Sequence, residues 1–221
     1  MNYTELLDRL ISLDACAVSD ALDSLGVSGT VDGLVRRSTK ERVAGRVQTM
    51  KLGAGASPGG STTHLGVRSI MESGETDVIV VEQKTGISAA AWGGILTHAA
   101  KLRKIRGIIV EGPVRDIDEC REVGVPVFSR SITARSARGR IHEAGVNVRV
   151  EIGEVSVEPG DFVIADGTGV VFIPAAMAGD VLDKAEMIAA RESSMVDAIH
   201  EGKPVDEVMG KDYEKLLDGS K

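Results

Sequence analysis

Three short apolar runs alternate with segments of helical period between residues 77 and 130. "DVIVVEQ" (77–83) and "GIIVEG" (107–112) are almost continuously apolar, and "VPVFSR" (125–130) is a third run. Between them, "AAWGGILTHAAKLRKI" (90–105) and "DIDECREVG" (116–124) space their apolar residues as helices do. Apolar strands separated by helices are typical of a parallel sheet that is covered on both faces. The order strand, helix, strand, helix, strand therefore predicts parallel βαβ units.

The segments before residue 77 and after residue 130 predict other elements. Residues 4–25 carry a helical apolar period that breaks near "LDAC", which predicts two short helices, the second capped by Ser19-Asp20. The pattern then predicts a strand over 43–52, a loop over 53–61, a helix over 63–74, short strands beyond residue 130, a helix over about 175–198 and a short helix with a frayed tail. Since no long linker interrupts these elements, we expect one domain spanning residues 1–221.

Composition and charge exclude several classes of protein. No window approaches 18 uninterrupted apolar residues, and "MNYTELLDRL" lacks the order of a signal peptide, so we expect a cytoplasmic protein without a membrane partner. The net charge of −7 and the low aromatic content of 3% argue against nucleic acid as a partner. Cys16 and Cys120 are in no CxxC spacing, so we expect two reduced thiols.

Several polar features favour no particular site. The loop "GAGASPGGS" lacks the GK[ST] ending of a Walker loop, and no glycine loop suits a methyltransferase cofactor. The four histidines (His64, His98, His142 and His200) show no ligand spacing, although His64 and His98 lie closest to the predicted cleft. Two basic clusters (Lys101, Arg103, Lys104, Arg106; Arg130, Arg135, Arg138, Arg140) are either solvated faces or a field that steers an anion toward the cleft.

Two short motifs follow neighbouring strands of the predicted sheet. Arg115-Asp116 comes just after the run that begins at residue 107, and Gly93-Gly94 opens the helix after the run at 77–83. In parallel sheets the loops and helix N-termini at the carboxyl ends of the strands form the ligand site. We therefore expect the two motifs to meet in space.

Each motif suits the binding of an anion or a cation. The backbone N–H groups of a helix that opens with glycines can hold a carboxylate, and Arg115 adds a planar fork of donors. Asp116 supplies a hard oxygen ligand of the kind that Mg²⁺ or Mn²⁺ takes. Together they predict a cup for a small anionic oxo-acid with a divalent ion at its lip. Two plainer interpretations stay open: Asp116 caps the following helix while Arg115 pairs with a surface carboxylate, and the glycines only allow close helix–sheet packing.

Nearly the whole chain, from about residue 5 to 205, resembles one known family. The segments that carry the resemblance are "VSDALDSLGV", the run from "AAWGGILTHAAK" to "GPVRDIDECREVGVPVFSR", and "EPGDFVIADGTGVVFIP". They resemble 4-hydroxy-4-methyl-2-oxoglutarate aldolases, a family that also contains the regulator of ribonuclease activity A (RraA). The resemblance implies an α/β/α sandwich of the swivelling phosphohistidine-domain type, and a homotrimer or hexamer with its active site between subunits.

The resemblance also implies an activity and residue roles. Enzymes of this family are lyases that use Mg²⁺ or Mn²⁺ to release pyruvate from a 4-hydroxy-2-oxo acid, and that also decarboxylate oxaloacetate. Carried over, Asp116 would ligate the metal, Arg115 would hold the substrate's oxygens, and the backbone of Gly93, Gly94, Ile95 and Leu96 would bind the carboxylate. A glutamate on the C-terminal helix would reach the next subunit's site, with Glu192 the best match and Glu186 close. The alternative function is that of a non-catalytic regulator of an endoribonuclease.

One position departs from the enzymes of that family. They usually carry an aspartate 21 positions before the arginine, where it organises metal-bound water, and here that position is Gly94. A compensating carboxylate is therefore expected from Glu72, Glu82, Glu111 or a neighbouring subunit, unless the metal chemistry is altered or lost.

Overall fold

The computed structural model describes residues 3–58 and 63–210, and within them nine strands form one curled, mixed sheet in the order β1-β11-β10-β3-β4-β5-β6-β2, with β7 paired to β3. A separate hairpin consists of β8 and β9. The strands are β1 (Thr30–Val31), β2 (Val35–Arg36), β3 (Val43–Ala54), β4 (Asp77–Glu82), β5 (Gly107–Val114), β6 (Val127–Ile132), β7 (Ile141–Val146), β8 (Val150–Ile152), β9 (Val155–Val157), β10 (Phe162–Ala165) and β11 (Val170–Ile173).

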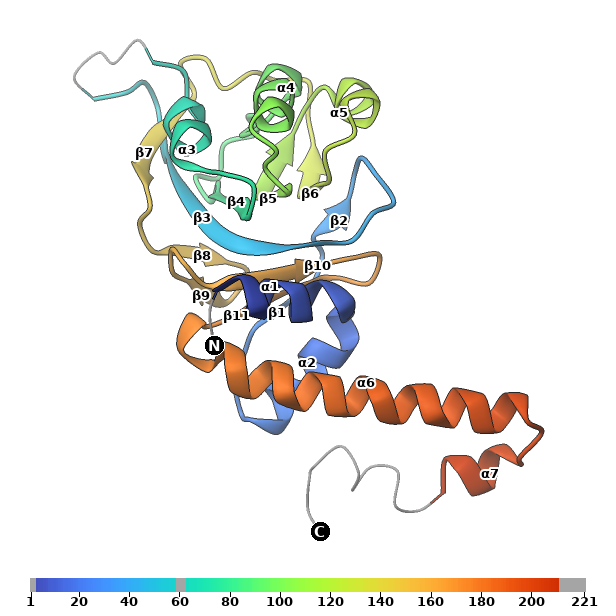
Figure 1. The fold of residues 1–221 in the computed structure, drawn as a ribbon. Helices are drawn as coiled ribbons and strands as arrows, with labels where there is room; N and C mark the ends of the chain where they lie inside the picture. The colour runs from blue at the N-terminus through green and yellow to red at the C-terminus, as the bar shows by residue number, and fades with distance from the viewer. Residues whose placement is uncertain (1–2, 59–62, 211–221) are drawn as a thin grey trace.

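Helices cover the curled sheet from two sides (Figure 1). On one side lie α3 (Val67–Glu72), α4 (Gly94–Leu102) and α5 (Ile117–Val123), and on the other lie α1 (Tyr3–Ser12), α2 (Ala15–Ser24) and α6 (Ala178–His200). A 3-10 turn (Ala175–Met177) precedes α6, and the short α7 (Val205–Val208) follows it. The expected α/β/α arrangement is confirmed.

The predicted βαβ units form the part of the sheet that matters for the site. β3, β4, β5 and β6 are mutually parallel in that order, with α4 between β4 and β5 and α5 between β5 and β6. The remaining pairings in this sheet are antiparallel. The carboxyl ends of β4 and β5 therefore meet at one edge, from which α4 and α5 both begin.

Three apolar clusters fill the molecule. One lies between the sheet and α3, α4 and α5, and includes Trp92, Ile108 and Cys120. A second joins α1, α2 and α6 to β10 and β11. The third joins strands of the curled sheet to the β8–β9 hairpin, and includes Val80 and Phe128 of the sheet with Val150 and Val157 of the hairpin. Because β4 and the first half of β5 are buried on both faces, their sequences lack alternation.

The structure corrects some of the expected elements. The second helix begins at Ala15, and its cap is Asp14, whose Oδ1 accepts a hydrogen bond of 2.8 Å from the N–H of Ala17. The prediction that Ser19-Asp20 caps it was wrong, since Ser19 lies inside α2 and its hydroxyl pairs with that of Thr30. The helices expected over 63–74 and 90–105 are shorter, and the parts of the expected loop and tail at 59–62 and 211–221 lie outside the described residues. Among the described helices, none is long and apolar enough to cross a membrane.

The reassigned cap of α2 can be tested by two substitutions. Asp14→Ala removes the acceptor for the Ala17 N–H and is expected to lower the free energy of unfolding by about 1 kcal/mol. Ser19→Ala removes only an exposed contact with Thr30 and is expected to cost less than about 0.5 kcal/mol. Urea denaturation of both variants measures the difference, and an equal loss would contradict the assignment.

Candidate active site

The segment before α4 is hydrogen-bonded alongside the end of β5. The N–H of Ala91 donates to the carbonyl of Pro113 at 2.9 Å, and the N–H of Arg115 donates to the carbonyl of Trp92 at 3.0 Å. These bonds bring the N-terminus of α4 beside Arg115 and Asp116. The two motifs expected to meet do lie together.

The Asp116 carboxylate is bound by both motifs. Its Oδ2 accepts a hydrogen bond of 3.1 Å from the N–H of Gly94, the first residue of α4, and Nε of Arg115 lies 3.0 and 3.1 Å from its two oxygens. Although Asp116 holds the N-cap position of α5, its side chain makes no capping hydrogen bond there. The interpretation that it caps the following helix was therefore wrong, and Arg115 pairs with Asp116 rather than with a surface carboxylate.

The backbone of Asp116 adopts an uncommon conformation. Its φ of 55° and ψ of 42° lie in the left-handed region, which asparagine and aspartate enter more easily than most residues. A residue held there costs roughly 1–3 kcal/mol and such residues cluster at functional sites. The conformation turns the carboxylate away from α5 and toward α4.

Each of the two glycines leaves room for a polar side chain. A Cβ on Gly93 would lie 2.7 Å from Oδ2 of Asp116 and 3.0 Å from Cγ of Arg115. A Cβ on Gly94 would collide with the carboxylate of Glu119. The glycines thus do more than allow helix–sheet packing, because they admit two carboxylates to the N-terminus of α4.

Glu119 is the side chain that sequence reasoning missed. It lies in the first turn of α5, three residues after Asp116, and its Oε1 lies 3.2 Å from Nε2 of His98 on α4. The signal was present in "RDIDE", which sets another acid, Glu119, three residues after Asp116 at the start of the helix. A carboxylate therefore lies next to Gly94, on α5 instead of on α4.

The glutamates expected to compensate for Gly94 within the chain bind elsewhere. Glu72 accepts a hydrogen bond of 2.8 Å from Asn147. Glu82 lies 3.1 Å from Lys51, and Glu111 lies 2.8 Å from Arg130, and both are buried. None of the three lines the cavity beside Asp116.

The two glutamates considered on the C-terminal helix differ in their surroundings. Glu186 is held within its own chain by Arg9, whose Nε lies 2.6 Å from Oε1. Glu192 faces α2, where burial, followed by the charges of Asp14 and Asp20, raises the pKa of its carboxyl. Both lie on α6, on the opposite side of the sheet from α4 (Figure 1), so neither joins Asp116 within one chain.

A buried polar cluster supports the turn at Gly93. The hydroxyl of Thr97 donates to the carbonyl of Gly93 at 2.9 Å and accepts from the indole N–H of Trp92 at 3.0 Å. Sγ of Cys120 lies 3.2 Å from the same hydroxyl, and burial raises the pKa of this thiol. The cluster ties α4 to α5 and fixes the position of both motifs, while Cys16 and Cys120 are free thiols.

A cavity of about 710 Å³ opens beside Asp116. One wall is formed by residues 90–96 with Arg115 and Asp116, and therefore holds every residue expected to bind substrate. The other wall comes from α3, from β7 and from described residues that precede each of them in the chain, with the lining residues Ala56, Ser57, Thr63, His64, Leu65, Arg68, Ser136, Ala137, Arg138, Gly139, Ile141, His142 and Glu143. Such a size is usual for the binding site of a small molecule.

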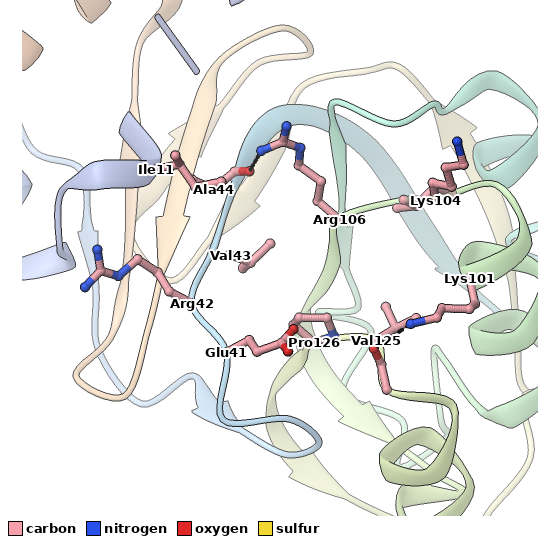
Figure 2. A pocket seen from close by; sticks show the side chains of 12 residues that line it. Ile11, Glu41, Arg42, Val43, Ala44, Lys101, Lys104, Arg106, Val125 and Pro126 are labelled. Atoms are coloured by element: carbon pink, nitrogen blue, oxygen red, sulfur yellow. Dashed lines mark hydrogen bonds between the residues drawn. The ribbon is translucent and has the colours of Figure 1, made fainter. Parts of the chain in front are cut away.

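The first basic cluster lies at another place. Lys101, Lys104 and Arg106 line a second hollow of about 390 Å³, together with Arg42 and Glu41 (Figure 2). It adjoins the amino-terminal ends of β3, β5 and β6, at the edge opposite to Asp116. Here Lys104 pairs with Glu75, and Arg106 donates a hydrogen bond to the carbonyl of Ala44. Because this hollow is separate from the cavity beside Asp116, the first basic cluster does not surround the predicted cleft. In the second cluster, Arg138 does line the cavity.

Comparisons with known proteins cover most of the chain. The model of the RraA-like family, described as Aldolase/RraA, matches residues 15–172. The chain belongs to this family. A putative 4-hydroxy-4-methyl-2-oxoglutarate aldolase of Halalkalibacterium halodurans is 27% identical over 88% of the chain and 89% of that protein.

Two further similarities extend along most of the chain. Protein DlpA of Legionella pneumophila is 30% identical over 91% of the chain, but the chain spans only 33% of that protein's length. A crystal structure of an uncharacterized protein from Pseudomonas syringae pv. tomato is also similar, with a TM-score of 0.84 and 29% sequence identity. The similarity covers 94% of this chain and 98% of the chain in that structure. The fold is therefore shared along nearly the whole chain.

Gly94→Ala is expected to displace Glu119 without unfolding the protein. The new Cβ would occupy the place of the Glu119 carboxylate, which is the mobile end of a half-exposed side chain, while alanine favours the helix by up to about 1 kcal/mol. We expect an unfolding temperature within about 5 °C of the parent and a shift of the His98 imidazole signals in NMR spectra. The control is Gly94→Ala in a Glu119→Ala background, where the glycine change should leave those signals unmoved.

Proposed function

We propose that the protein is a metal-dependent lyase that releases pyruvate from a 4-hydroxy-2-oxo acid, decarboxylates oxaloacetate, or does both. The observation that carries the proposal is the convergence of Arg115, Asp116 and Glu119 on the N-terminus of α4. The aldolase names of relatives support the reaction class.

The acidic side chains suit a hard divalent cation. Mg²⁺ and Mn²⁺ prefer oxygen ligands, and Mg²⁺ is commonly held by one or two carboxylates while it keeps several waters. Asp116 and Glu119 provide such carboxylates at Gly94. No group of three or more potential ligands occurs within residues 3–58 and 63–210, so water, substrate or a second subunit would complete the coordination. A bound Mg²⁺ or Mn²⁺ would act as a Lewis acid that stabilises negative charge on the substrate's oxygens.

The chain's own groups suit the two ends of a pyruvyl unit. The first N–H groups of a helix lack acceptors within the helix. Because Gly94 donates to Asp116, the N–H groups of Ile95 and Leu96 remain for the substrate carboxylate. Arg115 lies beside them and would hold the keto oxygen, on which negative charge develops when the carbon–carbon bond breaks. Donors fixed in place before the reaction stabilise that charge without reorganisation.

Glu119 fits the role that a side chain at position 94 would otherwise have. Its carboxylate occupies the space next to Gly94, and His98 limits its freedom. In the proposed reaction it positions water beside Asp116 or takes the proton of the substrate hydroxyl. The departure at Gly94 is then a relocation of a carboxylate from α4 to α5.

The reaction is tested by pyruvate formation from oxaloacetate and from 4-hydroxy-2-oxo acids with Mg²⁺ or Mn²⁺. We expect EDTA to abolish activity and Arg115→Ala to lower kcat/KM by about 100-fold or more, as for loss of an oxyanion donor. Asp116→Asn keeps the shape and tolerates the left-handed backbone, so its expected loss of at least about 100-fold reports the charge alone. Absence of pyruvate above a metal-only background across these substrates would refute the proposal.

We also propose that Glu192 serves the site of a neighbouring subunit in a homotrimer or hexamer. Because the pKa of Glu192 is raised, its charged form destabilises the folded chain, and the penalty disappears as the pH falls through that pKa. Glu192→Gln should therefore raise the unfolding temperature by about 1–3 °C at pH 7 but not near pH 4, while lowering activity.

Glu186→Gln is the matched control for that substitution. It weakens the contact with Arg9 and should lower the unfolding temperature at pH 7. Calorimetry at the two pH values, together with the pyruvate assay, separates these outcomes. Full activity in Glu192→Gln would exclude Glu192 from the site.

A regulator of an endoribonuclease is the second candidate, because the matched family includes RraA and position 94 lacks a carboxylate. The two candidates differ in what Glu119 does. A regulator requires no acid beside Gly94, so Glu119→Ala would leave inhibition of a ribonuclease unchanged, whereas the lyase loses activity.

A further inference from the structure

The first turn of α4 ends in a buried hydroxyl, that of Thr97, directly after residues 90–96 that line the cavity. Thr97 is fully buried, so its side chain cannot touch a ligand. Its Oγ1 donates to the carbonyl of Gly93 at 2.9 Å, accepts from the indole N–H of Trp92 at 3.0 Å, and lies 3.2 Å from Sγ of Cys120. A hydroxyl has one donor and two acceptor positions, so these three groups can use its full capacity.

Two of these groups lead from Thr97 to the backbone of Arg115. The carbonyl of Trp92 accepts a hydrogen bond of 3.0 Å from the N–H of Arg115. Sγ of Cys120, besides its contact with Thr97, lies 3.8 Å from the carbonyl of Arg115. One hydroxyl is therefore linked to the N–H of Arg115 through Trp92, to its carbonyl through Cys120, and directly to Gly93.

The indole of Trp92 depends on this hydroxyl more than the carbonyl of Gly93 does. The carbonyl also accepts the N–H of Thr97 at 3.1 Å, so it would keep one partner without the hydroxyl. Trp92 is 2% exposed, and its indole N–H donates to Thr97. A buried donor left without a partner is unfavourable, so loss of the hydroxyl favours a shift of the indole toward another acceptor. Because Trp92 lines the cavity, such a shift moves the cavity wall.

The donors of the proposed reaction project from the backbone that this hydroxyl connects. They are the N–H groups of Ile95 and Leu96, one turn after Trp92, and the guanidinium of Arg115. Fixed donors are effective because they already stand where negative charge develops. A displacement of about 1 Å, even one that originates away from the reacting atoms, can cost about 100-fold in rate.

We propose that Thr97 is a positioning residue of the site. Its hydroxyl holds the turn at Gly93 and, through Trp92 and Cys120, the backbone of Arg115 in the arrangement that binds the oxo-acid. The inference rests on the proposed lyase function and adds to it a residue that never touches the substrate.

Thr97→Val tests the role of the hydroxyl, because it replaces that group by a methyl group and keeps the branched shape. We expect kcat/KM for pyruvate formation to fall by about 10-fold or more. Part of the loss should persist in kcat at saturating substrate, since displaced donors stabilise the transition state less. Thr97→Ser keeps the hydroxyl and should restore kcat/KM to within about 3-fold of the parent.

Thr49→Val is the matched control. Thr49 is also fully buried, its hydroxyl donates to the carbonyl of Val148 at 2.5 Å, and it does not line the cavity. Both valine variants should lower the unfolding temperature by about 2–8 °C, as loss of a buried hydrogen bond does. Only Thr97→Val should lower kcat/KM by more than about 2-fold. Equal kcat/KM in the two variants would leave Thr97 a purely structural role and overturn the inference.

An NMR titration with pyruvate and Mg²⁺ separates this inference from the lyase proposal. In the parent, pyruvate should shift the amide signals of Ile95 and Leu96. Thr97→Val should need at least about 5-fold more pyruvate for half of that shift, whereas Thr49→Val should need the same amount as the parent.

The outcomes of the two measurements are distinct. If no substrate yields pyruvate but the titration shows the expected difference, the lyase proposal fails and the positioning role of Thr97 stands. If pyruvate forms equally well in Thr97→Val and Thr49→Val, only the Thr97 inference fails. If pyruvate shifts neither amide in the parent and none is formed, both fail.

Discussion

The hydrogen bond between the Gly94 N–H and the Asp116 carboxylate is the interaction on which the arrangement of the site depends. It joins the first residue of α4 to the residue that precedes α5, and so connects two consecutive βα units. A helix N-terminus attracts a carboxylate because its N–H groups are unpaired and its dipole is positive there. Here the protein supplies that carboxylate itself. The anion site predicted at Gly93-Gly94 is thus partly filled by the side chain predicted to stand beside it.

The rest of the local structure holds this contact in place. The backbone bonds between residues 91–92 and the end of β5 fix the approach of the two segments, and Thr97 fixes the turn at Gly93. Asp116 accepts a left-handed backbone so that its side chain points across to α4. A Cβ at position 93 would press on Asp116 and Arg115, and a Cβ at position 94 would displace the carboxylate of Glu119. The site therefore depends on the absence of side chains at positions 93 and 94 as well as on the charged residues.

The sequence predicted the parallel strands and the meeting of the two motifs, because apolar runs and helical periods are local signals that determine the edge at which loops gather. It did not predict the cap of α2, since "LDACAVSD" offers two acceptable caps, and only packing against α6 and β11 selects Asp14. It also missed Glu119 as the partner of Gly94. The carboxylates expected from the sequence lie on α3, β4 and β5, whereas Glu119 lies in the first turn of α5, three residues after Asp116.

The charges that border the cavity differ from one wall to the other. Beside Gly94 lie the carboxylates of Asp116 and Glu119, and Asp116, which lines the cavity, is paired with Arg115 and with the N-terminus of α4. On the other wall Arg138, an exposed side chain, has no acidic partner within 4.0 Å among the described residues. A ligand that spans the cavity would therefore meet a paired carboxylate on one wall and an arginine without a counter-charge on the other.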